Sequence, residues 1–202
     1  KNDTITVTLT YAGAGWDGTT KTAPTQDKSG VYLIDTAAKL AWFADAVNGG
    51  QKAINGKLTA NINLNGKPWT AIGTSSNKFA GTLDGDNYTV SGLVTTGLVG
   101  ELAEGGVVEN LRVNCAIVST SSLLGGVANS SAGTIRNCMV SGSITFSSEG
   151  HNGASEIGGI AGRTTGNGVI SGCVSRAVVK DAYDNSTYGT SAPLGGIAGY
   201  AY

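Results

Sequence analysis

Two polar segments carry most of the side chains that could bind a ligand. The first reads SSEGHNGASE and the second KDAYDNSTYGTSAP, and the second combines tyrosine rings with carboxylates and an amide. Aromatic rings stack on sugar rings, while carboxylate and amide oxygens accept hydrogen bonds from sugar hydroxyls. The candidate ligand-binding residues are Asp181, Tyr183, Asp184, Asn185 and Tyr188, together with His151 of the first segment.

Catalytic and metal-binding chemistry is less well supported. His151 is the sole histidine and stands in a polar loop, so any Ser-His-Asp or Cys-His site would depend on it. The densest acidic group, Asp84-Gly85-Asp86-Asn87, could suggest calcium, but the other spaced ligands of a calcium loop are missing and a turn explains it better. We expect no catalytic site, no metal and no cofactor.

Composition limits the class of protein and of partner. The chain has 202 residues, 32 glycines, 13% charged residues and a net charge of −1, which favours short strands and tight turns over a helical bundle. It has no basic stripe for nucleic acid and no apolar run near the ~20 residues that span a bilayer. We expect neither nucleic-acid binding nor membrane insertion, and the first residue, Lys1, fits either a processed secreted protein or an artificially shortened chain.

Internal repetition is the strongest signal in the sequence. Three short apolar segments recur in order, and the second and third are always nine residues apart. The central apolar residues are Leu98, Val127, Ile160 and Ile197 in the first segment, Val108, Ile135 and Ile170 in the second, and Ile117, Ile144 and Val179 in the third.

A coil of parallel strands explains this periodicity. Each segment would pair with its equivalent one turn along, about 4.8 Å away, so that inward side chains form columns. An antiparallel sandwich gives no reason for the constant nine-residue interval. We predict an all-β fold, a right-handed parallel β-helix (solenoid), with a Gly-Gly bend that lets Leu194 and Ile197 both face inward.

Polar and sulfur side chains should also stack. Asn110 and Asn137 fall at one turn of the coil, where asparagine tolerates a left-handed backbone, and Gly172 takes the third place. Cys138 and Cys173 should be neighbours, for which we predict no disulfide bond.

A single helix is predicted near the start, at residues 36–48. Asp35 or Thr36 can cap it, and Asn48-Gly49-Gly50 ends it. We divide the chain into an N-terminal cap region, 1–52, with an edge strand at Thr4 to Thr10 and this helix over the open end of the coil, and a β-helix, 53–202.

All variation in repeat length falls between the third segment and the next first segment. Residues 147–155 and 180–193 should therefore lie side by side at one edge, where insertions mark the binding side of many repeat proteins. Simple tolerance of loop length explains the same facts. The repeat is cut short at Tyr202, so we expect a longer native chain or an end-to-end contact there.

Several ordered segments resemble bacterial surface proteins with GLUG repeats. They are YLIDTAAKLAWFADAVNGG, LTANINLNGKPWTAIG, FAGTLDGDNYTVSGL, GLVGEL, VVENLRV and the GGIAG and IRNC pairs, and WDGTT also fits. The resemblance implies a secreted or cell-surface β-helix, as in adhesin-like proteins and in the non-catalytic part of some immunoglobulin A peptidases. It supplies no catalytic residues, and Gly172 departs from its expected asparagine.

The sequence therefore predicts a non-enzymatic, adhesin-like module of the bacterial cell surface or extracellular space, which presents loops to a glycan or protein. One alternative is a carbohydrate-active β-helix enzyme of polysaccharide lyase or hydrolase type, which would need converging carboxylates where the acids are scattered singly. Another is an accessory domain of a large secreted peptidase.

Overall fold

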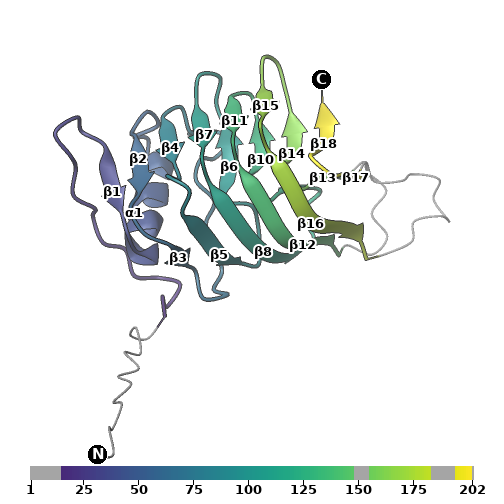
Figure 1. Cartoon of the computed structure of the whole chain (residues 1–202), viewed down its shortest axis with the longest axis horizontal. Helices are drawn as coiled ribbons and strands as arrows, with labels where there is room; N and C mark the ends of the chain where they lie inside the picture. Colours follow the sequence, from purple (N-terminus) through teal and green to yellow (C-terminus); the bar gives the residue numbers. More distant parts are fainter. Residues whose placement is uncertain (1–14, 148–154, 183–193, 202) are drawn as a thin grey trace, which may run out of the picture.

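The structure, a computed structural model, describes residues 15–147, 155–182 and 194–201. It is an all-β arrangement of parallel sheets with a single helix among the described residues (Figure 1). Every pairing between its named strands is parallel, as the periodic sequence predicts. The predicted edge strand at residues 4–10 lies outside the described residues.

The strands form four sheets. Sheet A contains β1 (Tyr32–Ile34), β2 (Gly56–Leu58), β4 (Thr82–Asp84), β7 (Val107–Glu109), β11 (Thr134–Arg136) and β15 (Val169–Ser171). Sheet B contains β3 (Ile62–Asn63), β5 (Thr89–Leu93), β8 (Arg112–Ser119), β12 (Met139–Phe146) and β16 (Val174–Asp181). Sheet C contains β6 (Val99–Leu102), β10 (Ala128–Ser131), β14 (Ala161–Thr164) and β18 (Ala198–Ala201). Sheet D contains β9 (Leu123–Gly125), β13 (Glu156–Gly158) and β17 (Leu194–Gly195).

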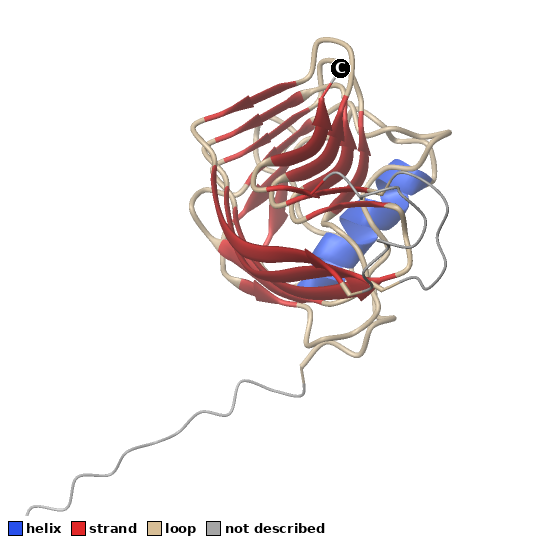
Figure 2. Cartoon of the chain, turned by 90° about the vertical axis from the view of Figure 1, so that its right-hand side faces the viewer, coloured by secondary structure: helices blue, strands red, loops and turns tan. Residues whose placement is uncertain are grey.

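From β6 onward the chain visits the sheets in the fixed order C, A, B, D, and we call one such run of four strands a circuit. The view along the stack shows the strands of successive circuits lying over one another around a common interior (Figure 2). The predicted columns are confirmed by the register: Val108 pairs with Ile135, and Ile135 with Ile170. Ile117, Ile144 and Val179 pair in the same way.

The first repeated segment differs from the prediction, because it forms two strands rather than one. β13 in sheet D and β14 in sheet C are separated by a bend at Gly159-Ile160, and the other circuits repeat it. At the corner a side chain on Gly158 would overlap the carbonyl oxygen of Ala161. The bend turns both Ile157 and Ile160 into the interior, where neither is exposed. The predicted Gly-Gly bend is thus present, but the prediction was wrong for Leu194 and Ile197, which are 44% and 39% exposed. They lie in the last described circuit, where no later described circuit covers them.

Helix α1 (Ala37–Asn48) lies beside β1 and β2 at one end of the stack (Figure 1). Thr36 is its N-cap, since the Thr36 side chain accepts a hydrogen bond from the Lys39 backbone N–H. Its apolar face, which includes Leu40, Phe43 and Val47, is fully buried. The Phe43 ring meets Phe79 edge to face at 5.8 Å, so helix and sheets share one core.

The circuits nearest the helix are less regular. Sheet C is represented there only by isolated parallel bridges, Ile72 to Val99 and Phe79 to Leu102. The segment that forms β1 belongs to the predicted cap region, and it pairs with β2 as the first strand of sheet A. Burial explains why it joins the sheet, since Ile34 is completely enclosed by the core.

Candidate functional site

Five of the six predicted ligand-binding residues, Tyr183, Asp184, Asn185, Tyr188 and His151, lie outside the described residues. Asp181 is the last residue of β16 and pairs with Phe146, the last residue of β12. The next backbone N–H, of Ala182, donates to the Phe146 carbonyl oxygen at 2.8 Å. The two variable segments therefore leave sheet B at the same corner on successive circuits, as the sequence predicts, and the chain re-enters at sheet D.

Many of the described carboxylates form separate ion pairs. Six of them lie within ion-pair distance of a lysine or arginine, and the pairs are Asp45–Lys21, Asp35–Lys39, Asp86–Lys57, Glu101–Lys78, Glu109–Arg136 and Glu156–Arg163. In the parts of the chain that the structure describes, no group of three or more His, Cys, Asp or Glu side chains could hold a metal ion.

The Asp84–Asn87 turn takes part in a ladder of side-chain hydrogen bonds along sheet A. The Asp84 carboxylate accepts hydrogen bonds from the Asp86 backbone N–H at 2.9 Å and the Asn110 amide at 3.0 Å. Asn137 in turn donates to the Asn110 amide oxygen at 3.3 Å. Asn110, Asn137 and Gly172 have φ values of 51°, 53° and 60°. The predicted left-handed asparagine stack is thus confirmed, and Asp84 extends it by one circuit.

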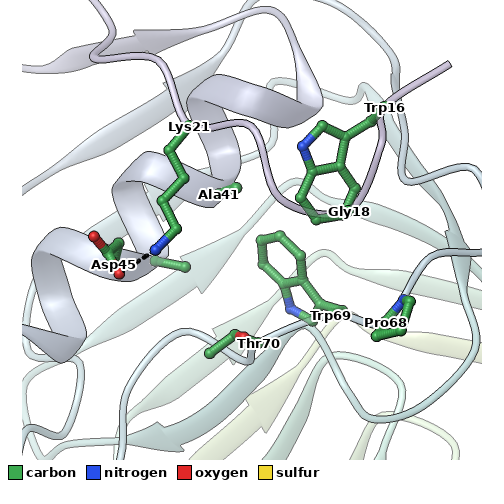
Figure 3. Close-up of a pocket in the computed structure, with 9 residues that line it drawn as sticks. Trp16, Gly18, Lys21, Ala41, Asp45, Pro68, Trp69 and Thr70 are labelled. Carbon is green, nitrogen blue, oxygen red and sulfur yellow. Dashed lines mark hydrogen bonds and ion pairs between the residues drawn. The ribbon is translucent and has the colours of Figure 1, made fainter. Parts of the chain in front are cut away.

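A small hollow lies at the end of the stack where helix α1 packs (Figure 3). Its walls come from the segment 15–25, which we call the strap, from helix α1 and from the loop at residues 68–70. It has a volume of about 70 Å³. The lining side chains are Trp16, Lys21, Ala41, Ala44, Asp45, Pro68, Trp69 and Thr70.

Two indole rings meet at this hollow, edge to face, with centroids 6.0 Å apart and planes at 64°. The Trp16 Nε1–H donates to the Thr20 carbonyl oxygen at 2.9 Å, and the Trp69 Nε1–H donates to the Leu98 carbonyl oxygen at 3.0 Å. Both polar atoms are thus satisfied within the protein, so the rings offer the hollow only carbon surfaces.

The strap is fixed to the body by several bonds. The Thr22 backbone N–H donates to the Ala38 carbonyl oxygen at 3.1 Å, and Lys21 Nζ lies 2.5 Å from an Asp45 carboxylate oxygen. Asp17 accepts hydrogen bonds from the hydroxyl and backbone N–H of Thr20 and from the backbone N–H of Thr19. These bonds, the Thr20 hydroxyl first, hold the pKa of Asp17 well below its usual range.

The hollow was not predicted from the sequence. Trp16 and Trp69 stand far apart in the chain, and both precede the periodic part, so no repeat brings them together. The available signal was compositional, because two of only three tryptophans stand in the short turn-forming stretches WDGTT and PWTAIG.

The predicted contact between Cys138 and Cys173 is present: the Cys138 backbone N–H donates to the Cys173 sulfur at 3.4 Å. The interaction between the two thiols lowers the pKa of Cys173 and raises the pKa of Cys138, and burial raises the pKa of Cys138 as well. Burial raises the pKa of Cys115 to about 11.

We expect Cys173 to be the thiol that reacts in the folded protein, because it is half-buried whereas Cys115 and Cys138 are buried. Iodoacetamide should label Cys173 first, at a lower pH than it labels the cysteines of the urea-unfolded chain. Peptide mass spectrometry after timed labelling checks this. Labelling of Cys138 or Cys115 ahead of Cys173 would contradict it, and Cys173→Ser is the control that should leave the folded protein almost unlabelled.

Comparisons with known proteins support the fold and leave the family open. No protein-family model matches the chain. A halomucin of Haloquadratum walsbyi is 30% identical over 192 residues, which cover 81% of this chain and 2% of the halomucin. A candidate Gly-rich membrane protein of Evansella cellulosilytica is 29% identical over 63% of this chain and 15% of its own length. The chain thus spans only a small part of either relative.

A solved structure has the same fold over most of the chain. It is the crystal structure of a candidate immunoglobulin A1 protease from Bacteroides ovatus, with a TM-score of 0.63 and 18% identity. The match covers 90% of this chain and 65% of the solved one. The chain is therefore similar in fold to part of a larger protein.

In the described part of the protein no helix is both long and apolar enough to cross a membrane.

Proposed function

We propose that this chain is an extracellular bacterial surface module, adhesin-like and without catalytic activity, that presents loops at one corner to a glycan or protein. The observation that carries the proposal is the common exit of both variable segments beside the Phe146–Asp181 pair. Loops of different length on one edge of a rigid scaffold are typical of binding surfaces in repeat proteins.

The architecture that supports this role is a right-handed parallel β-helix of the GLUG-repeat kind. Its support is the fixed order of sheets C, A, B, D and the parallel register. We keep the proposed division into an N-terminal cap region, 1–52, and a β-helix, 53–202; its support is α1, which buries its apolar face against the end of the stack. A scaffold of this kind holds its corners in place whatever loops they carry.

A binding role fits the charges better than a lyase or hydrolase role. Glycoside chemistry needs two carboxylates about 5–10 Å apart across a sugar. Six of the described carboxylates are each paired with one cation, and Glu156, for example, is held by both the Nε and Nη2 groups of Arg163.

The extracellular location rests on the named relatives. One relative is named as a membrane protein and another as a halomucin, while the structural neighbour is described as a protease. The neighbour also favours a second candidate, an accessory domain of a large secreted peptidase. In that case the corner loops would contact protein rather than sugar.

A glycan-array screen of the chain against a Tyr183→Ala/Tyr188→Ala variant tests the proposal. We expect the variant to lose most binding, because each stacked aromatic ring supplies a large share of contact with a sugar. Lys28→Ala, in an exposed turn near β1, is the control that should bind as the unmodified chain does. Equal binding by the tyrosine variant would remove the corner loops as the site.

A further inference from the structure

We propose that the hollow between the strap, helix α1 and the loop at residues 68–70 is a second ligand site, which takes one edge of a neutral pyranose ring. The proposal rests on the proposed binding function but concerns different residues. It joins three observations: two indole rings with satisfied N–H groups, an exposed ion pair at the rim, and a strap already fixed in place.

The indole rings supply the apolar half of the site. A pyranose ring has faces of C–H groups, and these pack on indole carbon surfaces. Because the Trp16 and Trp69 N–H groups already donate to backbone carbonyls, a ligand gains contact with the rings without breaking a hydrogen bond. Trp69 is only 6% exposed, so Trp16 provides most of the accessible surface.

The ion pair supplies the polar half. The Lys21 and Asp45 side chains are 46% and 60% exposed, which leaves hydrogen-bonding capacity toward solvent. An ammonium has three donors and a carboxylate accepts through two oxygens, so the pair can bond to neighbouring sugar hydroxyls in both directions. The two charges balance, and this favours a neutral sugar over an acidic one.

The geometry is organised before any ligand arrives. Three contacts hold the strap. Thr22 is bonded to the helix backbone, and Lys21 is paired with Asp45. The Asn65 amide donates to the Trp16 carbonyl oxygen at 3.3 Å. Binding therefore orders few further groups, which keeps its entropic cost low.

The size of the hollow limits the affinity. Its volume of about 70 Å³ is far below the ~300 Å³ of pockets that enclose a whole ligand. Only one edge of the ring enters, so we expect dissociation constants on the order of millimolar for a single sugar. Clustered sugars on a surface would raise the apparent affinity.

The three tryptophans make an NMR titration decisive. The indole N–H signals of the folded chain would be followed while methyl β-D-glucopyranoside, methyl β-D-galactopyranoside or sorbitol is added to about 100 mM. We expect a pyranoside to shift the Trp16 and Trp69 signals saturably and sorbitol, an open chain, to leave them in place. Trp42, which packs on Tyr32 at 5.2 Å outside the hollow, is the internal control and should not move.

Matched variants distinguish a ligand-binding hollow from one that only holds the strap against the rest of the protein. Asp45→Asn should weaken pyranoside binding about tenfold, since it removes a charged hydrogen-bond acceptor. Asp35→Asn removes a similarly exposed carboxylate paired with Lys39 and should change nothing. Equal affinity of Asp45→Asn and the unmodified chain, or shifts that are linear and the same in sorbitol, would overturn the proposal.

The outcome is independent of the corner loops. Tyr183→Ala/Tyr188→Ala should keep the tryptophan shifts. If that variant loses array binding while no pyranoside moves the indole signals, the corner site stands and the hollow binds no sugar but only holds the strap in place. If the indole shifts persist while array binding does not depend on the tyrosines, the hollow stands and the corner site fails.

Discussion

Replacing Phe43 with alanine is expected to lower the free energy of unfolding by about 3–5 kcal/mol, the usual cost of removing a buried aromatic ring. Phe43 is completely buried and meets two rings, Phe79 at 5.8 Å and Tyr32 at 6.3 Å. Its ring also lies against Gly56 of sheet A, where a Cβ would come within 2.9 Å of it. The cavity would thus open between the helix and the sheets. Urea unfolding followed by circular dichroism measures the loss.

Trp42→Ala is the matched control, since it removes a larger ring from the next position of the same helix. Trp42 is only partly buried and packs on one ring, Tyr32. We expect a clearly smaller loss than for Phe43→Ala. If the two variants were equally stable, helix α1 would not be joined to the core through Phe43.

The second large effect is expected at the Gly-Gly bend. A side chain at Gly159 would overlap the carbonyl oxygen of Gly196 in the next circuit and the Ser175 hydroxyl. Backbone atoms of a stacked circuit cannot move without disturbing the register, so Gly159→Ala should destabilise the protein by about 1–3 kcal/mol or more. The same measurement of unfolding free energy applies.

Gly196→Ala tests the steric origin of that effect. Gly196 is the equivalent residue one circuit later, and a Cβ there would meet nothing within 4 Å. Neither glycine has a positive φ, so alanine is not strained by the backbone at either position. We expect Gly196→Ala to be neutral or to stabilise by about 0.4–1 kcal/mol through the unfolded chain. A similar loss at both positions would show that clash between circuits is not the cause.

The sequence predicted the columns because stacked strands repeat their own pattern. Val127 and Ile160 could be aligned from the amino-acid sequence alone, and the Val127 backbone N–H does donate to the Ile160 carbonyl oxygen at 2.9 Å. The helix was also predictable, since Thr36 and the Gly49-Gly50 pair mark its ends locally. Both features depend on residues close in sequence or on exact repetition.

Features without repetition were not predicted. The segment 32–34 carries no signal that it pairs with β2, and the join between Trp16 and Trp69 depends on a strap that no period describes. The fourth strand of each circuit, the one in sheet D, was not predicted either. The Gly-Gly pair was identified as a bend, but only the register shows that the chain changes sheet there.

Of the predicted binding residues, only Asp181 can be placed, at the end of β16. The sequence did predict which corner the variable segments share, because residues that lengthen a repeat must leave the stack between the same two strands. It could not predict the hollow at the opposite end of the stack, where three non-periodic segments meet.

The ladder bonds between circuits have a mechanical consequence. They run along the long axis of the stack, from β1 at one end to β18 at the other (Figure 1). Tension applied to the two ends therefore loads one rung of bonds at a time, and circuits detach in succession. Partners in the register such as Val99 and Ala128 are about thirty residues apart, so each detached circuit lengthens the chain by on the order of 100 Å. Such a body yields to stretching in steps, and the circuits still in contact keep their form.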